Sequence, residues 1–229
     1  MPTNSLRESQ VATGKGDDGS TGLLFGGARI SKDDLRTEAY GTIDEAVAAM
    51  GLARAELGAL AGAGMLNPVL TGLADLILRF QRELFVAGAE LATNPDAWDR
   101  QVEGQTRVSR PMLDGVETVL AEMEAGIAMP REFVVPGETP ASAAIEVART
   151  VLRRAERRTV TVQREGLVPG QYLLPYLNRL ADLLWVMARA AEQAEARIAT
   201  PARVGGRPQS ARADARRTAA GDRLRSDGA

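Results

Sequence analysis

Residues 144–160 read AIEVARTVLRRAERRTV, and the spacing of their side chains predicts a helix with two different faces. At 3.6 residues per turn, small and branched apolar side chains fall on one stripe. The members of this stripe are Ala144, Val147, Val151, Ala155 and Val162. An apolar stripe of this length predicts a helix that packs along its whole length against other helices.

A second stripe of the same helix is charged and carries Glu146, Arg149, Arg153 and Glu156. Arg149 and Arg153 lie one turn apart, with an acid above and an acid below. One interpretation is a solvated face with salt bridges, which is common on helices. The other is an anion-binding clamp, because guanidinium groups are permanently charged and match the geometry of phosphate oxygens.

The composition limits the chemistry that the chain can perform. It has 229 residues, of which 45% are hydrophobic and 4% aromatic, and its net charge is −2. These values favour one domain of packed helices and argue against nucleic acid as a partner. Histidine and cysteine are absent, which excludes Ser-His-Asp and Cys-His triads, thiol chemistry and His-ligated metals. A metal ion would need oxygen ligands, as Mg²⁺ does.

Apolar periodicity and helix-breaking residues divide the chain into five expected helices. Their approximate ranges are 33–61, 68–92, 110–127, 140–165 and 171–196. We therefore predict an all-α five-helix bundle, with a domain at 13–196 and Ser31 capping the first helix. Residues 1–12 are expected to be a disordered N-terminus, and residues 197–229 a disordered basic tail. Without a signal core or a membrane-spanning run, we expect a cytoplasmic protein with no membrane partner.

Two loops stand out between these helices. Residues 13–22, TGKGDDGSTG, combine four glycines with hydroxyl groups and Lys15. Such a loop can bring backbone N–H groups to an anion, although an ordinary glycine-rich turn has the same composition. Residues 129–142 contain Phe133 before two valines, among prolines and a glycine. The simpler expectation is that Phe133 packs into the core, and the alternative is that the loop presents it to a flat ligand.

Four sequence blocks resemble one family. In order, they are TGKGDDGSTGL with ISKDDLRTEAYGTIDE, then FVVPG, VARTVLRRAER and YLNRLADLLWVMAR. With these blocks, which cover about 13–195, the chain resembles the PduO-type ATP:cob(I)alamin adenosyltransferases, also called corrinoid adenosyltransferases. The resemblance implies a five-helix bundle assembled as a homotrimer, with active sites between subunits.

The resemblance also implies a reaction. The family transfers the 5′-deoxyadenosyl group of ATP to the cobalt of cob(I)alamin, or of a corrinoid precursor, and releases triphosphate. ATP and cob(I)alamin are then substrates, and Mg²⁺ accompanies ATP through phosphate oxygens, so no residue is assigned as a metal ligand. Co(I) is a strong nucleophile, which suits a chain without His or Cys. A corrinoid reductase and an adenosylcobalamin-dependent enzyme are the implied protein partners.

Site residues are carried over from the same blocks. The resemblance implies an ATP loop that contains Thr13, Gly14, Lys15, Gly16, Thr21 and Gly22. It implies further nucleotide contacts from Lys32, Arg153, Arg154, Ala155, Glu156, Arg157 and Asn178. Arg153 would stabilise the leaving group, Asp44 and Arg149 would form a pair that bridges subunits near the site, and Phe133 would pack under the corrin ring and displace its lower ligand.

The chain departs from the family pattern at several positions. The usual Thr-Lys-Thr-Gly start is Thr-Gly-Lys-Gly at 13–16, and Glu146 stands where histidine is common. Glu138 replaces the second glycine of a Pro-Gly-Gly turn, and an asparagine common after Asp-Glu in the first helix is missing. Two other functions therefore remain open: a non-catalytic sensor or delivery protein for nucleotide or corrinoid, and a plain helical scaffold.

Overall fold

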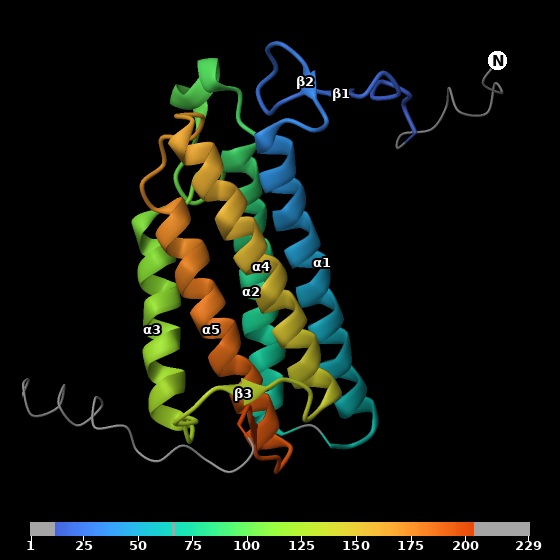
Figure 1. Cartoon of the computed structure of the whole chain (residues 1–229), viewed down its shortest axis with the longest axis vertical. Coiled ribbons are helices and arrows are strands. Elements are labelled where there is room, and N and C mark those ends of the chain that lie inside the picture. The colour runs from blue at the N-terminus through green and yellow to red at the C-terminus, as the bar shows by residue number, and fades with distance from the viewer. Residues whose placement is uncertain (1–11, 66, 204–229) are drawn as a thin grey trace, which may run out of the picture.

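The computed structural model describes residues 12–65 and 67–203, and its main feature is a bundle of five long helices (Figure 1). These helices are α1 (Leu35–Gly62), α2 (Pro68–Leu91), α3 (Arg110–Gly126), α4 (Pro140–Arg164) and α5 (Leu173–Ala194). The prediction of an all-α five-helix bundle is confirmed, and each expected boundary lies within two residues of the observed one.

Short elements lie at the two ends of the bundle. β1 (Ser20–Thr21) pairs with β2 (Ile30–Ser31), and β3 (Val134–Val135) pairs with β4 (Thr200–Pro201), both antiparallel. A 3-10 helix, η2 (Pro95–Arg100), follows α2. The predicted start of the disordered tail at residue 197 was too early, because the backbone at 200–201 is paired with β3. Residues 1–11 and 204–229, for which disorder was also predicted, lie outside the described residues.

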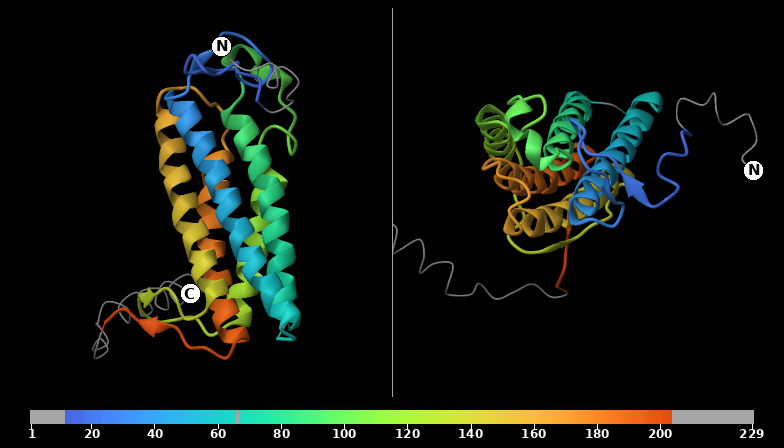
Figure 2. Two further views of the ribbon diagram at one scale, coloured as in Figure 1. Left: turned by 90° about the vertical axis from the view of Figure 1, so that its right-hand side faces the viewer. Right: turned by 90° about the horizontal axis from the view of Figure 1, so that it is seen from above.

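The direction of the helices decides where these short elements lie. α1 runs away from the β1–β2 pair, α4 runs back beside it, and α5 again leads away (Figure 1). The β1–β2 pair therefore lies at one end of the bundle and the β3–β4 pair at the other, as the side view in Figure 2 also shows. In the part of the chain that the structure describes, no helix is long and apolar enough to cross a membrane.

The helix starts follow local capping chemistry. Asn67 accepts a hydrogen bond from the Leu70 N–H at the start of α2, and Thr139 and Ser142 form a reciprocal capping box at the start of α4. The cap of α1 is Asp34, which accepts from the Arg36 N–H. Ser31 was the predicted cap, but its backbone is already paired with Ser20 in the β1–β2 pair, so the helix begins one turn later.

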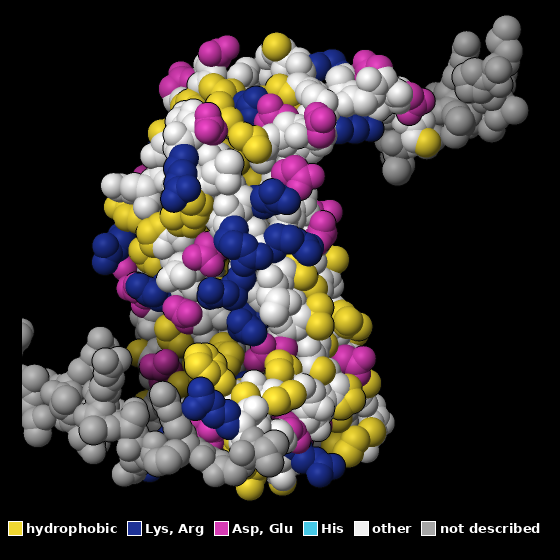
Figure 3. All heavy atoms as spheres, in the orientation of Figure 1, with side chains coloured by type: hydrophobic (Ala, Val, Ile, Leu, Met, Phe, Trp, Pro, Cys, Tyr) yellow, Lys and Arg dark blue, Asp and Glu magenta, His cyan; other side chains and the backbone are white. Residues whose placement is uncertain are grey.

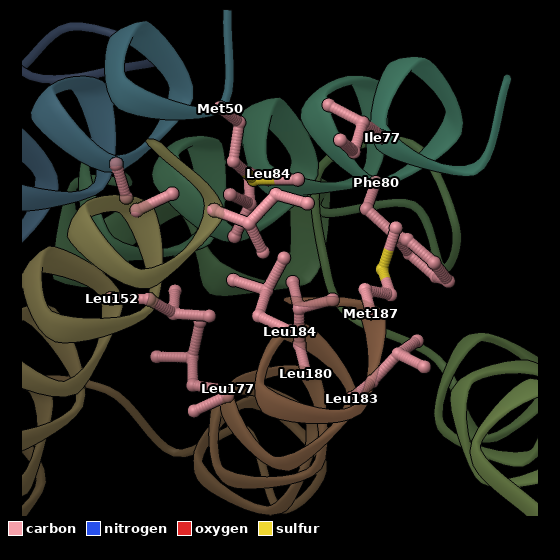
Figure 4. Packing of buried hydrophobic residues seen from close by; sticks show 14 of the residues in the cluster. Met50, Ile77, Phe80, Leu84, Leu152, Leu177, Leu180, Leu183, Leu184 and Met187 are labelled. Carbon is pink, nitrogen blue, oxygen red and sulfur yellow. The ribbon is translucent and has the colours of Figure 1, made fainter. Parts of the chain in front are cut away.

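The core lies between α1, α2, α4 and α5, where large apolar side chains interdigitate (Figure 4). The buried apolar residues of α4 are Ala141, Ala144, Ile145, Ala148, Leu152, Ala155 and Val162. The predicted stripe was therefore partly wrong, because Val147 is half exposed and Val151 only partly buried. The buried side chains are Ala148 and Leu152, one position further on. A shift of one residue turns the helix face by about 100°, and alanines on that face let α4 lie close to its neighbours.

Candidate functional site

The glycine-rich loop is folded back on itself by two cationic side chains. Arg29 donates from Nε to the Ser20 hydroxyl (2.7 Å) and from an Nη atom to the carbonyls of Lys15 (2.7 Å) and Ser20 (2.9 Å). Lys32 donates from Nζ to the Gly16 carbonyl (2.7 Å). The structure thus brings Lys32 onto the predicted loop. It also adds Arg29, which sequence reasoning missed although it is one of only three basic residues between positions 12 and 32.

Two glycines are required for this loop geometry. Gly14 has a φ of 67°, which is in the left-handed region. A Cβ on Gly16 would lie 2.9 Å from Lys32 Nζ and 3.2 Å from the Ser20 carbonyl oxygen, so a side chain there would displace Lys32. Hydrogen bonds from the Ser20 hydroxyl and N–H lower the pKa of the Asp18 carboxyl below its usual value. Asp18 thereby helps to fix the loop that Lys32 and Arg29 close.

The loop is also fastened to the end of α2. The Leu24 N–H donates to the Ala92 carbonyl (2.8 Å), and the Asn94 N–H donates to the Leu24 carbonyl (3.1 Å). The Arg100 guanidinium lies over the Phe25 ring, 4.5 Å from its centroid. These contacts fix the base of the loop, while Thr13, Gly14 and Lys15 stay exposed.

The arginines on the exposed side of α4 differ in whether they form ion pairs. Arg154 pairs with Glu45 and Arg158 with Glu38 (3.7 Å), and both pairs join α4 to α1. Arg153 and Arg157 are exposed, and their side chains form no ion pair or hydrogen bond within residues 12–65 and 67–203. Figure 3 shows Lys and Arg side chains gathered over the middle of this face. One turn apart on α4, Arg153 and Arg157 are available to an anion.

A side-chain amide from α5 completes this charged face. Asn178 donates from Nδ2 to Glu156 (3.0 Å) and accepts from Arg179 (3.1 Å). Glu156 lies one turn beyond Arg153, so the structure brings Glu156 and Asn178 together beside the free arginines. Ala155, which the resemblance places among the nucleotide contacts, is fully buried in the core. Its side chain supports the helix from the other face.

The predicted pair of Asp44 and Arg149 does not form within one protomer. Arg149 donates from Nε to Glu146 (2.6 Å) instead. Asp44 is exposed and forms no ion pair with any other part of the described chain. Glu146 was expected on the charged stripe, for which a solvated face was one interpretation, but only 3% of its surface is exposed. The reason is Arg189 of α5, which lies 3.3 Å from the Glu146 carboxylate and draws it inward.

Phe133 is presented to solvent, with 89% of its surface exposed. The expectation that it packs into the core was wrong. The Ala202 N–H donates to the Phe133 carbonyl (2.8 Å), which extends the β3–β4 pairing and fixes the loop. Phe133, Val135 and Ile198 lie on or next to this strand pair, and all three are exposed. We call these three residues the apolar ribbon face.

The glycine-rich loop and the apolar ribbon face are far apart in one protomer. The loop precedes α1, the ribbon precedes α4, and these antiparallel helices lie side by side (Figure 2). A helix of 25 residues, as in α4, is about 37 Å long. The charged face with Arg149 and Arg153 lies between the two ends. A ligand much shorter than α4 therefore cannot contact both ends of one protomer.

Over residues 12–65 and 67–203, no group of three or more His, Cys, Asp or Glu side chains could hold a metal ion.

Comparisons with known proteins point to one family. The sequence profile of the cobalamin adenosyltransferase family matches residues 11–191. The corrinoid adenosyltransferase of Citrobacter freundii is 36% identical over an alignment of 192 residues, which covers 80% of this chain and 95% of that protein. The corrinoid adenosyltransferase of Mycobacterium tuberculosis (strain ATCC 25618 / H37Rv) is 37% identical over 185 residues, which are 80% of this chain and 89% of that protein.

Solved structures that are similar to this chain come from the same family. A variant PduO-type ATP:corrinoid adenosyltransferase from Lactobacillus reuteri, complexed with cobalamin and ATP, superposes with a TM-score of 0.70 at 28% identity. The match covers 84% of this chain and 98% of that one. A second variant from the same organism, complexed with ATP, has a TM-score of 0.70 at 27% identity, over 83% and 99% of the two chains.

Proposed function

The chain belongs to the cobalamin adenosyltransferase family, and we propose that it transfers the 5′-deoxyadenosyl group of ATP to the cobalt of a reduced corrinoid. The observation that carries this proposal is the pair of free guanidinium groups, Arg153 and Arg157, beside Asn178 on the α4–α5 face. Two guanidinium groups one turn apart match the spread charge of a triphosphate.

The chemistry requires positioning and charge stabilisation. The electron pair of Co(I) forms a bond to C5′ of ATP, the bond between C5′ and oxygen breaks, and triphosphate leaves with the electrons of that bond. Arg153 is the residue that we assign to the charge developing on the triphosphate. No proton has to be abstracted, so the absence of histidine and cysteine from the chain is no obstacle.

The glycine-rich loop would surround the triphosphate. Lys32, Lys15 and the backbone N–H groups of Gly14 and Gly16 supply donors, and the hydroxyls of Thr13 and Thr21 lie in the same loop. Because Lys32 already donates to the Gly16 carbonyl, its ammonium group is held near the phosphates before they arrive. Mg²⁺ would enter with ATP and be held mainly by phosphate oxygens.

The corrinoid would bind against the apolar ribbon face. Phe133 offers a flat apolar ring that protrudes from a fixed strand pair. Packed under the corrin ring, it would keep water and the lower ligand away from cobalt, which favours the four-coordinate form that is reduced to Co(I). Val135 and Ile198 would widen the apolar contact. Both complete cobalamin and a biosynthetic precursor meet these requirements.

A homotrimer with sites between subunits is part of the proposal. Two observations support it: the glycine-rich loop and the apolar ribbon face are at opposite ends of one protomer, and Asp44 lacks an ion-pair partner within the described chain. A partner subunit would supply an arginine to Asp44. A reductase that delivers Co(I) and an enzyme that uses adenosylcobalamin are the protein partners that this reaction calls for, and the cytoplasmic location stays a prediction.

The test is an anaerobic absorbance assay with ATP, Mg²⁺ and chemically reduced cob(I)alamin, in which loss of the Co(I) band is followed. We expect conversion to a light-sensitive adenosyl product together with release of triphosphate. ATP that raises the melting temperature without any triphosphate release would instead identify a nucleotide-binding sensor, because a ligand that binds only the native state must stabilise it.

A further inference from the structure

A network of four alternating charges joins α5 to the charged face of α4. Arg189 is fully buried and makes a bidentate contact with Glu192, from Nε (2.8 Å) and from an Nη atom (2.7 Å). Its other Nη atom lies 3.3 Å from one oxygen of Glu146, an ion pair without a hydrogen bond. The second oxygen of Glu146 accepts from Arg149 Nε (2.6 Å). The network therefore begins in the core and ends at Arg149.

The geometry leaves the outer part of Arg149 free. A guanidinium group has five N–H donors in a fixed plane, and Glu146 occupies the one on Nε. The side chain of Arg149 is 22% exposed, and no hydrogen bond to its Nη atoms occurs within residues 12–65 and 67–203. Because Arg189 lies against the Glu146 carboxylate from behind, the acceptor of the Arg149 Nε–H is held in one place.

Stability alone is a weak reason for such a network. Buried ion pairs lose about as much from desolvation as they gain from attraction, and apolar side chains of similar volume often stabilise a core better. Two acids and two arginines leave the cluster without net charge, so it adds nothing to the overall field of the face. What the network does provide is a fixed orientation for one arginine at the surface.

We propose that Glu146 is a positioning residue, which aims the Arg149 guanidinium at the active site by holding it against the buried Arg189–Glu192 pair. The inference rests on the proposed function, in which Arg149 acts at the site between subunits. Where the family commonly has histidine, this chain has a carboxylate that forms ion pairs with two arginines at once.

A double-mutant cycle in the adenosyl-transfer assay tests this role. Glu146→Gln is expected to lower kcat/KM by about 10- to 100-fold, because a reacting group that is misplaced by about 1 Å costs on that order. In the Arg149→Ala background, Glu146→Gln should cause no further loss, since nothing remains to be positioned. Losses that multiply in the double variant would overturn the proposal.

A matched variant controls for lost stability. Glu83 is also a largely buried acid, which accepts from Tyr176 (2.9 Å) and from Arg79 (2.7 Å) away from the proposed site. Glu83→Gln should lower the melting temperature and leave kcat/KM unchanged at temperatures well below melting. If Glu83→Gln and Glu146→Gln reduce kcat/KM equally, the effect is general destabilisation and the positioning role is wrong.

A spectroscopic measurement separates this inference from the proposed function. In nitrogen-15-labelled protein, the Nε–H signal of Arg149, assigned through Arg149→Ala, should be resolved in the wild type and lost in Glu146→Gln. A wild type without transfer activity that still shows this difference would refute the function and retain the positioning role. An Arg149 signal that is identical with and without the Glu146 carboxylate would refute the positioning role whatever the activity.

Discussion

At the scale of single residues, neighbouring arginines on α4 have unlike surroundings. Arg154 contacts Glu45 of α1, whereas Arg153, about 100° further round the helix, has no side-chain partner in the described chain.

The sequence predicts that Arg149, Arg153 and Glu156 share one stripe, and periodicity alone suffices for that. It does not predict that Arg189 draws Glu146 out of the stripe, because that contact joins residues 43 positions apart.

Arg153 carries the most direct prediction at this scale. We expect Arg153→Ala to lower kcat by about 100- to 1000-fold, because a cation at the leaving group acts mainly in the transition state. Melting temperature should change little, since the side chain has no partner to lose. Arg164→Ala, at the exposed end of the same helix, is the matched control and should keep full activity. Normal specific activity with a lower melting temperature in Arg153→Ala would contradict the assignment.

At the scale of elements, the helices follow from the sequence and the ribbon does not. Periodic apolar residues, Asn67 and Thr139 as caps, and Pro68 and Pro140 in first turns define α2 and α4. β4 contains only Thr200 and Pro201, too short a segment to show a period. Its pairing with β3 spans more than sixty positions of sequence, so the exposure of Phe133 could be raised only as an alternative.

The ribbon leads to a prediction about reduction. Phe133→Ala should weaken the reaction that starts from cob(II)alamin more than the reaction that starts from chemically generated Co(I), since displacing the lower ligand matters for reduction. Parallel anaerobic assays from the two starting states measure this. Val102→Ala changes another exposed apolar residue, at the opposite end of the bundle, and should affect neither assay. Equal losses from both starting states in Phe133→Ala would limit Phe133 to general corrinoid contact.

At the scale of the whole molecule, one buried acid makes stability depend on pH. Burial raises the pKa of Glu90 to about 7 from its ordinary value of 4.5. One oxygen accepts from the Val108 N–H (2.7 Å), and the other has no hydrogen-bond partner in the described chain. That oxygen would lie 1.6 Å from a Cβ on Gly170, so glycine is required there. Glu90 thus connects α2 to the loops before α3 and α5.

The sign of the effect follows from the raised pKa. Between pH 4.5 and about 7 the Glu90 carboxyl is protonated in the folded protein but increasingly ionised in the unfolded chain. The free energy of unfolding therefore falls as pH rises through this window, and the fall is complete above about pH 7. Glu90→Gln should therefore stabilise the protein at pH 8 by about 2–3 kcal/mol, and much less at pH 4.5. Melting curves across this range measure it, with exposed Glu165→Gln as control. Parallel pH profiles for wild type and Glu90→Gln would refute the role of burial.

Subunit assembly can be tested with two inactive variants in one oligomer. Lys32→Ala removes a donor from the glycine-rich loop, and Phe133→Asp places a charge on the apolar ribbon face, at the other end of the protomer. If each site takes its loop from one subunit and its ribbon from the next, every trimer that contains both variants has one of its three sites intact. Coexpression with two affinity tags isolates the mixed trimers, and light scattering should give three times 24.4 kDa.

If each site is built within one subunit, every site in a mixed trimer carries one of the two substitutions and no site is intact. Mixed trimers as inactive as their parents would therefore place each site inside a single subunit.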